Sequence, residues 1–138
     1  MRIETARPEE TEAAGAELAT RLRPGDLVLV AGELGSGKTT FVRGACRALG
    51  ITDRVTSPSF TIGHVYVGGP AEVAHIDLYR LRSLAGEDPA LLDDYLTPER
   101  IGFVEWPEIA APRLDRPAAR VTIEHLGEDR RAIELELE

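Results

Sequence analysis

The feature that most constrains this chain is a glycine-rich segment between an apolar run and a helical pattern. Residues 27–31 (LVLVA) form an uninterrupted apolar run, which predicts a strand buried on both faces of a parallel sheet. Residues 32–39 (GELGSGKT) match the pattern G-x-x-x-x-G-K-[ST], and residues 38–49 predict a helix that ends at Gly50. A strand, a glycine turn and a helix in this order predict an α/β fold built around a phosphate-binding loop.

The residue types of this loop suit the binding of a polyphosphate. Glycine lets successive backbone N–H groups turn inward around a phosphate, in conformations that a side chain would obstruct. The Lys38 ammonium can neutralise terminal phosphates, the Thr39 hydroxyl can bind Mg²⁺, and the start of the following helix adds its dipole. We therefore predict a nucleoside-triphosphate site, with these nucleotide-binding residues: Glu33, Leu34, Gly35, Ser36, Gly37, Lys38, Thr39 and Thr40.

A triphosphate bound with Mg²⁺ also needs a carboxylate near the loop, at the C-terminal end of a strand. Asp77 follows the mostly apolar residues 73–76, and Glu105 follows the apolar residues 101–104. We predict both as catalytic residues, and either one could bind Mg²⁺ while the other positions water. His75 lies within the first of these runs and is expected to be a structural histidine with satisfied hydrogen bonds.

The rest of the chain alternates predicted strands and helices. These are a strand at 2–6, a helix from Pro8 to about Leu22, strands at 60–67, 73–78 and 101–104, a short helix at 90–96, and a hairpin of 121–123 with 133–137. We expect one P-loop nucleotide-binding domain over residues 1–138, with a mixed central sheet flanked by helices and a C-terminal antiparallel hairpin.

The composition predicts a soluble protein and disfavours direct binding of nucleic acid. The chain carries 16 Lys and Arg against 24 Asp and Glu, a net charge of −8, whereas proteins that bind phosphate backbones usually present a basic face. The single cysteine, Cys46, excludes an internal disulfide. Apolar runs stay well below the about 18 residues of a membrane span, and the first residues lack the apolar core of a secretory signal. We expect a cytoplasmic protein without a membrane segment.

Four segments resemble a known family in their order and spacing. They are residues 32–40 (GELGSGKTT), 56–61 (TSPSFT), 75–81 (HIDLYRL) and 105–108 (EWPE). Glycine loops of this kind occur in many families, so the DLYR and EWPE elements carry most of the specificity. Together the segments are similar to the TsaE family (formerly YjeE), the bacterial P-loop ATPases of tRNA threonylcarbamoyladenosine modification.

This resemblance implies a weak, Mg²⁺-dependent ATPase with ATP or ADP as the bound nucleotide. It also implies two protein partners, TsaB and TsaD, of which TsaD transfers the threonylcarbamoyl group to the adenosine beside the tRNA anticodon. The TsaE-like subunit is then required for turnover and meets tRNA only indirectly.

The resemblance also assigns roles to residues by their position. Thr39 and Glu105 would bind Mg²⁺, and Asp77 would support the metal or a water. Residues 56–61 would form a loop that senses the nucleotide.

Three further residues receive roles from the same resemblance. Trp106 would lie beside the site, and Thr11 and Arg131 would approach the adenine or the ribose. The chain departs from the family at Ser36, where Ala is frequent, and at Ser59, where Thr is usual. Both departures are small, and Ser59 keeps a hydroxyl.

Two functions from other classes remain open on the sequence. A small-molecule phosphotransferase would use the same loop, but it needs an acceptor pocket and usually an arginine-rich lid, and residues 85–96 are more acidic than basic. A nucleotide-dependent interaction module would need binding without hydrolysis. A phosphorylation screen tests the first, and a Glu105→Ala variant tests the second.

Overall fold

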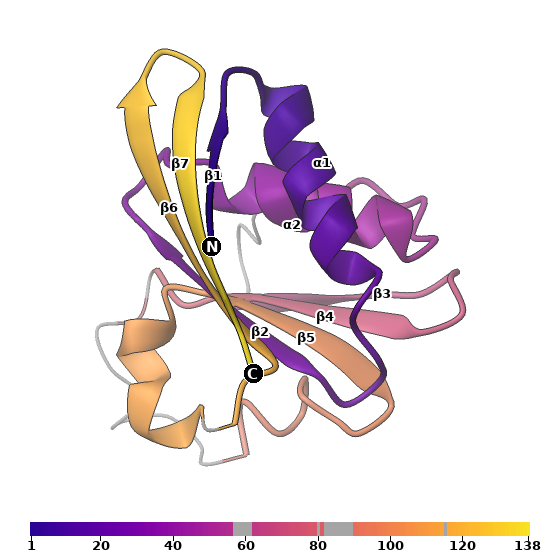
Figure 1. Cartoon of the computed structure of the whole chain (residues 1–138). Helices are drawn as coiled ribbons and strands as arrows, with labels where there is room; N and C mark the ends of the chain where they lie inside the picture. Colours follow the sequence, from indigo (N-terminus) through magenta and orange to yellow (C-terminus); the bar gives the residue numbers. More distant parts are fainter. Residues whose placement is uncertain (57–61, 80, 82–89, 115) are drawn as a thin grey trace.

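The computed structural model describes residues 1–56, 62–79, 81, 90–114 and 116–138 (Figure 1). Its elements are β1 (Arg2–Thr5), α1 (Pro8–Ala19), β2 (Leu27–Gly32), α2 (Lys38–Ala48), β3 (Gly63–Tyr66), β4 (Glu72–Asp77), β5 (Arg100–Glu105), the 3₁₀ helix η1 (Pro107–Arg113), β6 (Ala119–Gly127) and β7 (Arg130–Leu137). Within the described part of the chain, none of the helices combines the length and apolar character that a membrane crossing requires.

The strands form one mixed sheet in the order β1-β7-β6-β2-β5-β4-β3. The central pairs β6–β2, β2–β5 and β5–β4 are parallel, and the marginal pairs β1–β7, β7–β6 and β4–β3 are antiparallel. This arrangement confirms the predicted mixed α/β sheet, and β6 with β7 forms the predicted C-terminal hairpin. The hairpin is longer than the alternating patterns alone indicate.

The parallel centre of the sheet brings three strand ends to one edge. Strand β2 ends at Gly32, β4 at Asp77 and β5 at Glu105. Asp77 lies opposite Glu105 in the β4–β5 register, and Val30 lies opposite Glu105 in the β2–β5 register. The glycine loop and both predicted carboxylates therefore meet at the C-terminal edge of the parallel strands.

Helices α1 and α2 pack against each other and cover one face of the sheet (Figure 1). Two glycines permit their close approach. A Cβ at Gly15 would lie 2.1 Å from the Phe41 carbonyl oxygen, and a Cβ at Gly44 would lie 1.9 Å from the Glu12 carbonyl oxygen. Any larger residue at either position would therefore push the two helix backbones apart.

The opposite face of the parallel strands carries a second apolar cluster. Strand alternation directs Leu29, Ile76 and Val104 to this face, where Ala110 of η1 and Leu92 cover them. Figure 1 shows η1 on the side of the sheet away from α1 and α2. The central strands are thus buried on both faces, as their continuous apolar runs predict.

Two predicted helices differ from the structure. Helix α1 ends at Ala19 rather than near Leu22, because the following amides of Arg21 and Leu22 form i→i−3 bonds, which tighten the last turn. Leu22 still packs on the core, so the apolar periodicity extends beyond the end of the helix.

The short helix predicted at 90–96 is wrong, because this segment forms hydrogen-bonded turns. Its bonds mix i→i−4 (Leu96 N–H to the Leu92 carbonyl) with i→i−3 (Tyr95 N–H to the same carbonyl). Asp93 and Asp94 are weak helix formers, and Pro98 disfavours a helical conformation at the residue before it. Of the strand predicted at 60–67, the structure describes Gly63–Tyr66 as β3. Residues 60 and 61 lie outside the described residues.

Candidate functional site

A cavity of about 310 Å³ opens at the edge where β2, β4 and β5 end. Its lining gathers most of the predicted site residues, namely Leu34, Gly35, Ser36, Gly37, Lys38, Thr39, Thr40, Asp77, Glu105, Trp106 and Arg131. Segments far apart in the sequence thus converge on one space, as the edge of a parallel sheet predicts.

The glycine loop turns the chain from β2 into α2 with backbone conformations that favour glycine. Gly35 has a φ of 76° and Gly37 a φ of 105°, both in the left-handed region. Gly37 occupies the N-cap position of α2 and has no side chain to cap the helix. The positive end of the helix dipole therefore faces the cavity.

Lys38 places a buried cation inside this loop. Its ammonium donates to the carbonyl oxygens of Gly32 at 2.7 Å and Glu33 at 2.8 Å, and lies 3.5 Å from Ser36 Oγ. The side chain is only 5% exposed, and Nζ lies 4.4 Å from the centre of the Trp106 ring. Burial lowers the pKa of Lys38, whereas the nearby carboxylate of Glu105 opposes that shift.

Glu105 is the acidic residue held most closely to the loop. Its Oε2 lies 3.0 Å from Thr39 Oγ1, which donates, and 2.6 Å from His75 Nε2. The residue is 2% exposed. Thr39 and Glu105 come from α2 and β5, so the structure joins the two residues predicted to share Mg²⁺.

Asp77 lines the same cavity but makes a different set of contacts. Its Oδ1 accepts a hydrogen bond from the Tyr79 backbone N–H at 2.9 Å, at the end of β4. Partial burial raises the pKa of the Asp77 carboxyl, against the lowering effect of that hydrogen bond. Asp77 and Glu105 therefore differ in setting, one half-buried beside the cavity and the other buried and bonded to Thr39.

The donors of this cavity fit Mg²⁺ as a partner of a bound polyphosphate. Among the described residues, no three His, Cys, Asp or Glu side chains cluster closely enough to hold a metal ion by themselves. Protein sites for Mg²⁺ commonly supply only one or two carboxylates, and water and substrate phosphates complete the shell. A hydroxyl and carboxylates beside a glycine loop are such a donor set.

Trp106 follows Glu105 directly and has an unusual backbone. Its φ of 59° is left-handed, a conformation that costs a bulky residue roughly 1–3 kcal/mol. The ring contacts both the Lys38 ammonium and the Tyr79 ring, whose centre is 5.0 Å from that of Trp106. The strained turn therefore brings the aromatic ring to the wall of the cavity.

Thr11 and Arg131 lie on the flank of the loop. Both line a small cavity of about 30 Å³ together with Gly37 and Thr40. The Thr11 hydroxyl pairs with Thr5 at 2.8 Å and is buried. Arg131 donates to the Glu128 carbonyl at 2.7 Å and lies 3.4 Å from the Gly35 carbonyl.

Some predicted site residues lie outside the main cavity. Thr11 lines the small flanking cavity rather than the main one, and Glu33 contributes its backbone carbonyl to Lys38. Thr56 accepts a hydrogen bond at 3.5 Å from the Tyr66 hydroxyl. The remaining residues of the predicted sensing loop, 57–61, lie outside the described residues.

The contact between His75 and Glu105 is a feature of the site that the sequence analysis does not predict. His75 is a buried histidine with partners for both ring nitrogens, as expected, but one of those partners is Glu105. A signal was available in the strand period, because His75 stands two residues before Asp77 and so shares its face of β4. The pairing with Glu105 depends on the β4–β5 register, which the sequence does not display.

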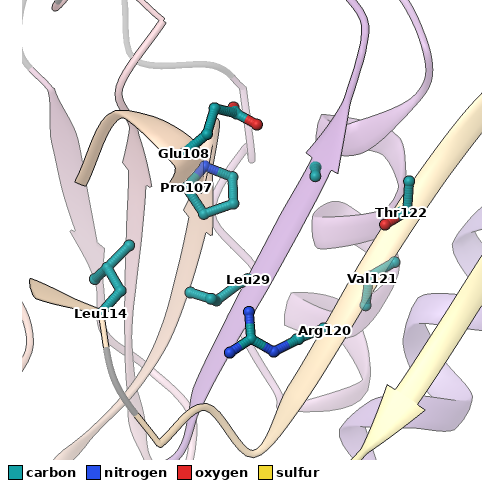
Figure 2. Close-up of a pocket in the computed structure, with 8 residues that line it drawn as sticks. Leu29, Pro107, Glu108, Leu114, Arg120, Val121 and Thr122 are labelled. Atoms are coloured by element: carbon teal, nitrogen blue, oxygen red, sulfur yellow. The ribbon is translucent and has the colours of Figure 1, made fainter. Parts of the chain in front are cut away.

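A second, larger cavity of about 400 Å³ lies between β2, β6 and η1. Figure 2 shows Arg120 and Thr122 of β6 and Glu108 of η1 around it, with Leu29 at its base. Neither the glycine loop nor the carboxylates at the strand ends line it. The smaller cavity, with its convergent charged groups, is therefore the candidate site.

Comparisons with known proteins agree with this fold. The sequence model of a family described as "Threonylcarbamoyl adenosine biosynthesis protein TsaE" matches residues 5–133. The chain is 37% identical to the Bacillus subtilis tRNA threonylcarbamoyladenosine biosynthesis protein TsaE, over 96% of this chain and 83% of that protein. It is 31% identical to the Treponema pallidum protein of the same name, over 96% and 98% of the two chains.

The fold is similar to that of a solved relative. The crystal structure of Bacillus subtilis YdiB superposes with a TM-score of 0.82 and 33% sequence identity, covering 99% of this chain and 84% of that one. Family match, sequence identity and structure all lead to one assignment. The chain belongs to the TsaE family of threonylcarbamoyladenosine biosynthesis proteins.

Proposed function

We propose that this chain is the Mg²⁺-dependent, ATP-binding and slowly hydrolysing subunit of tRNA threonylcarbamoyladenosine modification. The modified adenosine lies next to the anticodon, and the chain acts with the TsaB and TsaD partners through docking that depends on the bound nucleotide. The observation that carries the proposal is the convergence on one cavity of the glycine loop, the Lys38 ammonium and the Thr39–Glu105 pair.

The loop residues would bind the nucleotide through the Lys38 ammonium and the backbone N–H groups at the start of α2. Lys38 would exchange at least one of its carbonyl partners, Gly32 or Glu33, for a phosphate oxygen. That exchange is favourable because an anionic oxygen forms the stronger hydrogen bond with an ammonium. The uncapped start of α2 would add its dipole to the same phosphates.

The strand-end residues would orient the reacting groups. Thr39 and Glu105 would hold Mg²⁺ when it is bound, and this ion would supply charge neutralisation to the β- and γ-phosphates. Asp77, whose raised pKa reflects partial burial, would accept a hydrogen bond from an attacking or a metal-ligating water. Trp106 would cover the phosphates at the cavity wall.

The arginine content of the site supports slow intrinsic hydrolysis. Among the residues that the structure describes, Arg131 is the arginine that lines the cavity, and its Nη1 already donates to the Glu128 and Arg130 carbonyls. A positioned arginine commonly accelerates phosphoryl transfer by about 10³–10⁵-fold. We expect a partner to supply that acceleration or to limit turnover by docking and release.

Reconstitution of the tRNA modification tests the proposal directly. The reaction is assembled with TsaB, TsaD and tRNA, with no added subunit, with this chain, or with its Lys38→Ala variant. We expect multiple turnovers only with the unmodified chain. Equal modification with the Lys38→Ala variant would contradict a nucleotide-dependent role.

A Glu105→Ala variant separates hydrolysis from docking in the same assay. Loss of ATP hydrolysis together with loss of multiple turnover supports the ATPase function. Full modification activity, with nucleotide binding and partner docking retained, would instead favour an interaction module in which hydrolysis is incidental.

A further inference from the structure

His75 lies fully buried in β4, between side chains of the two neighbouring strands. Its exposed fraction is 0%. Its Nε2 lies 2.6 Å from Glu105 Oε2 on β5, and its Nδ1 lies 3.4 Å from the Tyr66 hydroxyl on β3. The ring therefore bridges three adjacent strands just below the candidate site.

The chemistry of an ionised Glu105 indicates the direction of the hydrogen bond between His75 and this carboxylate. An ionised carboxylate has only acceptors, so His75 Nε2 carries a proton and donates it to Glu105. In the neutral ring, Nδ1 is then an acceptor, and the single proton of the Tyr66 hydroxyl is shared between this nitrogen at 3.4 Å and the Thr56 carbonyl oxygen at 3.5 Å. Burial raises the pKa of Tyr66 to about 12, so this hydroxyl keeps its proton.

The same carboxylate oxygen receives a second donor. Glu105 Oε2 lies 3.0 Å from Thr39 Oγ1, whereas Oε1 is farther from that hydroxyl, at 3.4 Å. Two donors, one from β4 and one from α2, therefore converge on a single oxygen. A partial rotation of the carboxylate about its Cγ–Cδ bond would lengthen both hydrogen bonds.

We propose that His75 is a positioning residue, which holds the Glu105 carboxylate against Thr39 in the orientation that the bound metal and nucleotide require. Tyr66 in turn holds the imidazole ring. This inference rests on the proposed function, because it concerns how a residue of the same site is held in the orientation that binding requires. An apolar side chain would fill this space in β4 without the desolvation cost of a buried imidazole. However, it would remove one of these two donors to Glu105 and leave the other, the Thr39 hydroxyl.

The test measures how nucleotide binding depends on Mg²⁺ in the folded full chain. The affinity for ADP is measured in EDTA and across a Mg²⁺ titration, for the wild type, His75→Leu and His75→Gln. We expect His75→Leu to raise the half-saturating Mg²⁺ concentration by about 10-fold or more, because loss of a group that orients a metal ligand typically costs 10–100-fold. The affinity in EDTA should change less than about twofold, because the phosphate contacts are intact.

The conservative variant and an exposed histidine provide the controls. Gln can place an amide N–H near the position of Nε2, so His75→Gln should recover most of the Mg²⁺ response. His125 is exposed, and its Nε2 donates a hydrogen bond to the Glu128 carbonyl, so His125→Leu should match the wild type. If His75→Leu does not fold, Tyr66→Phe removes the hydroxyl that contacts Nδ1 of the ring and should also raise the Mg²⁺ requirement.

A spectrum of the ligand-free protein gives a readout that is independent of binding. The chain has 3 histidines, so nitrogen-15 labelling of histidine yields a simple spectrum. We expect a protonated Nε2 on His75 that exchanges slowly with solvent, and faster exchange in Glu105→Ala.

The outcomes separate the two proposals. A wild-type chain that binds no nucleotide overturns the proposed function and this inference with it. A wild-type chain that binds nucleotide, with an unchanged Mg²⁺ requirement in folded His75→Leu, overturns this inference alone. A ring protonated only at Nδ1 overturns it as well.

Discussion

Charged side chains that are almost fully buried define the site at the scale of single residues. Lys38 and Glu105 are 5% and 2% exposed, and each is satisfied by partners from other elements. Burial of charge is costly unless partners compensate, so such groups concentrate where a chain binds or reacts. Asp77 lines the same cavity but is only half-buried, and this burial raises the pKa of its carboxyl.

An Asp77→Asn variant should be more stable than the wild type at neutral pH and less active. The folded-state pKa of Asp77 is raised above 3.8, so the folded protein binds this proton more tightly than the unfolded chain. Ionisation at neutral pH therefore costs stability, and the amide, which can still accept from the Tyr79 N–H, avoids that cost.

Thermal unfolding of ligand-free protein across pH checks this prediction. The stability advantage of Asp77→Asn should be greatest at pH 7–8, should shrink as the pH falls through the raised pKa, and should vanish below about pH 4, near the unfolded value. A variant that is less stable than the wild type at pH 7 would contradict the assigned burial of this carboxylate. ATP hydrolysis should fall in the same variant.

The sequence revealed the acidic residues of the site but not the contact between His75 and Glu105. Asp77 and Glu105 could be predicted because each ends an apolar strand, and parallel strands in one sheet end at the same edge. The contact between His75 and Glu105 could not be predicted, because these residues are 30 positions apart and their contact depends on how β4 and β5 align. Trp106 was expected beside the site, but its left-handed backbone has no signal in residue type.

At the scale of elements, the contact between α1 and α2 determines the position of α2, the helix that follows the glycine loop. Glycine in a helix normally weakens it by about 1 kcal/mol relative to alanine. Gly44 lies at a point where a Cβ would overlap the Glu12 carbonyl of the neighbouring helix. Close backbone packing therefore outweighs helix propensity here.

A Gly44→Ala variant should lower the free energy of unfolding by roughly 1–3 kcal/mol, because the added methyl group forces α1 and α2 apart. Ala13→Gly provides the matched control, since Ala13 is exposed on α1 and reports propensity alone. It should cost about 1 kcal/mol. Denaturant unfolding measures both variants, and a Gly44→Ala chain more stable than the wild type would contradict the packing described for the two helices.

Elements with strong local signals were predictable, and those held by distant contacts were not. The strands 73–78 and 101–104 and the closing hairpin follow from apolar patterns, and they match β4, β5 and the pair β6–β7 within a few residues. The turns at 90–96 have helical spacing but are shaped by packing of Leu92 and neighbouring side chains on the second cluster. The 3₁₀ helix η1 was missed, since its Pro-containing sequence has no helical periodicity.

At the scale of the whole molecule, the net charge of −8 bears on how the chain meets tRNA. Affinity for nucleic acid depends largely on the release of counterions by basic residues. We therefore predict that the isolated chain does not form a submicromolar complex with tRNA at physiological salt. Filter binding or fluorescence anisotropy measures this, and a tight complex would contradict the indirect role proposed for the subunit.

The central claim is that the cavity at the end of β2 binds a nucleotide with Mg²⁺, and calorimetric titration tests it most directly. ATP and ADP are titrated into the wild-type chain and into Lys38→Ala, in magnesium buffer and at two temperatures. We predict one site per chain in the wild type and an affinity about 10–100-fold weaker in the variant, since a buried hydrogen bond to a charged group contributes about 1.5–3 kcal/mol. A wild-type chain that gives no binding heat at either temperature, or a variant that binds equally well, would contradict the account.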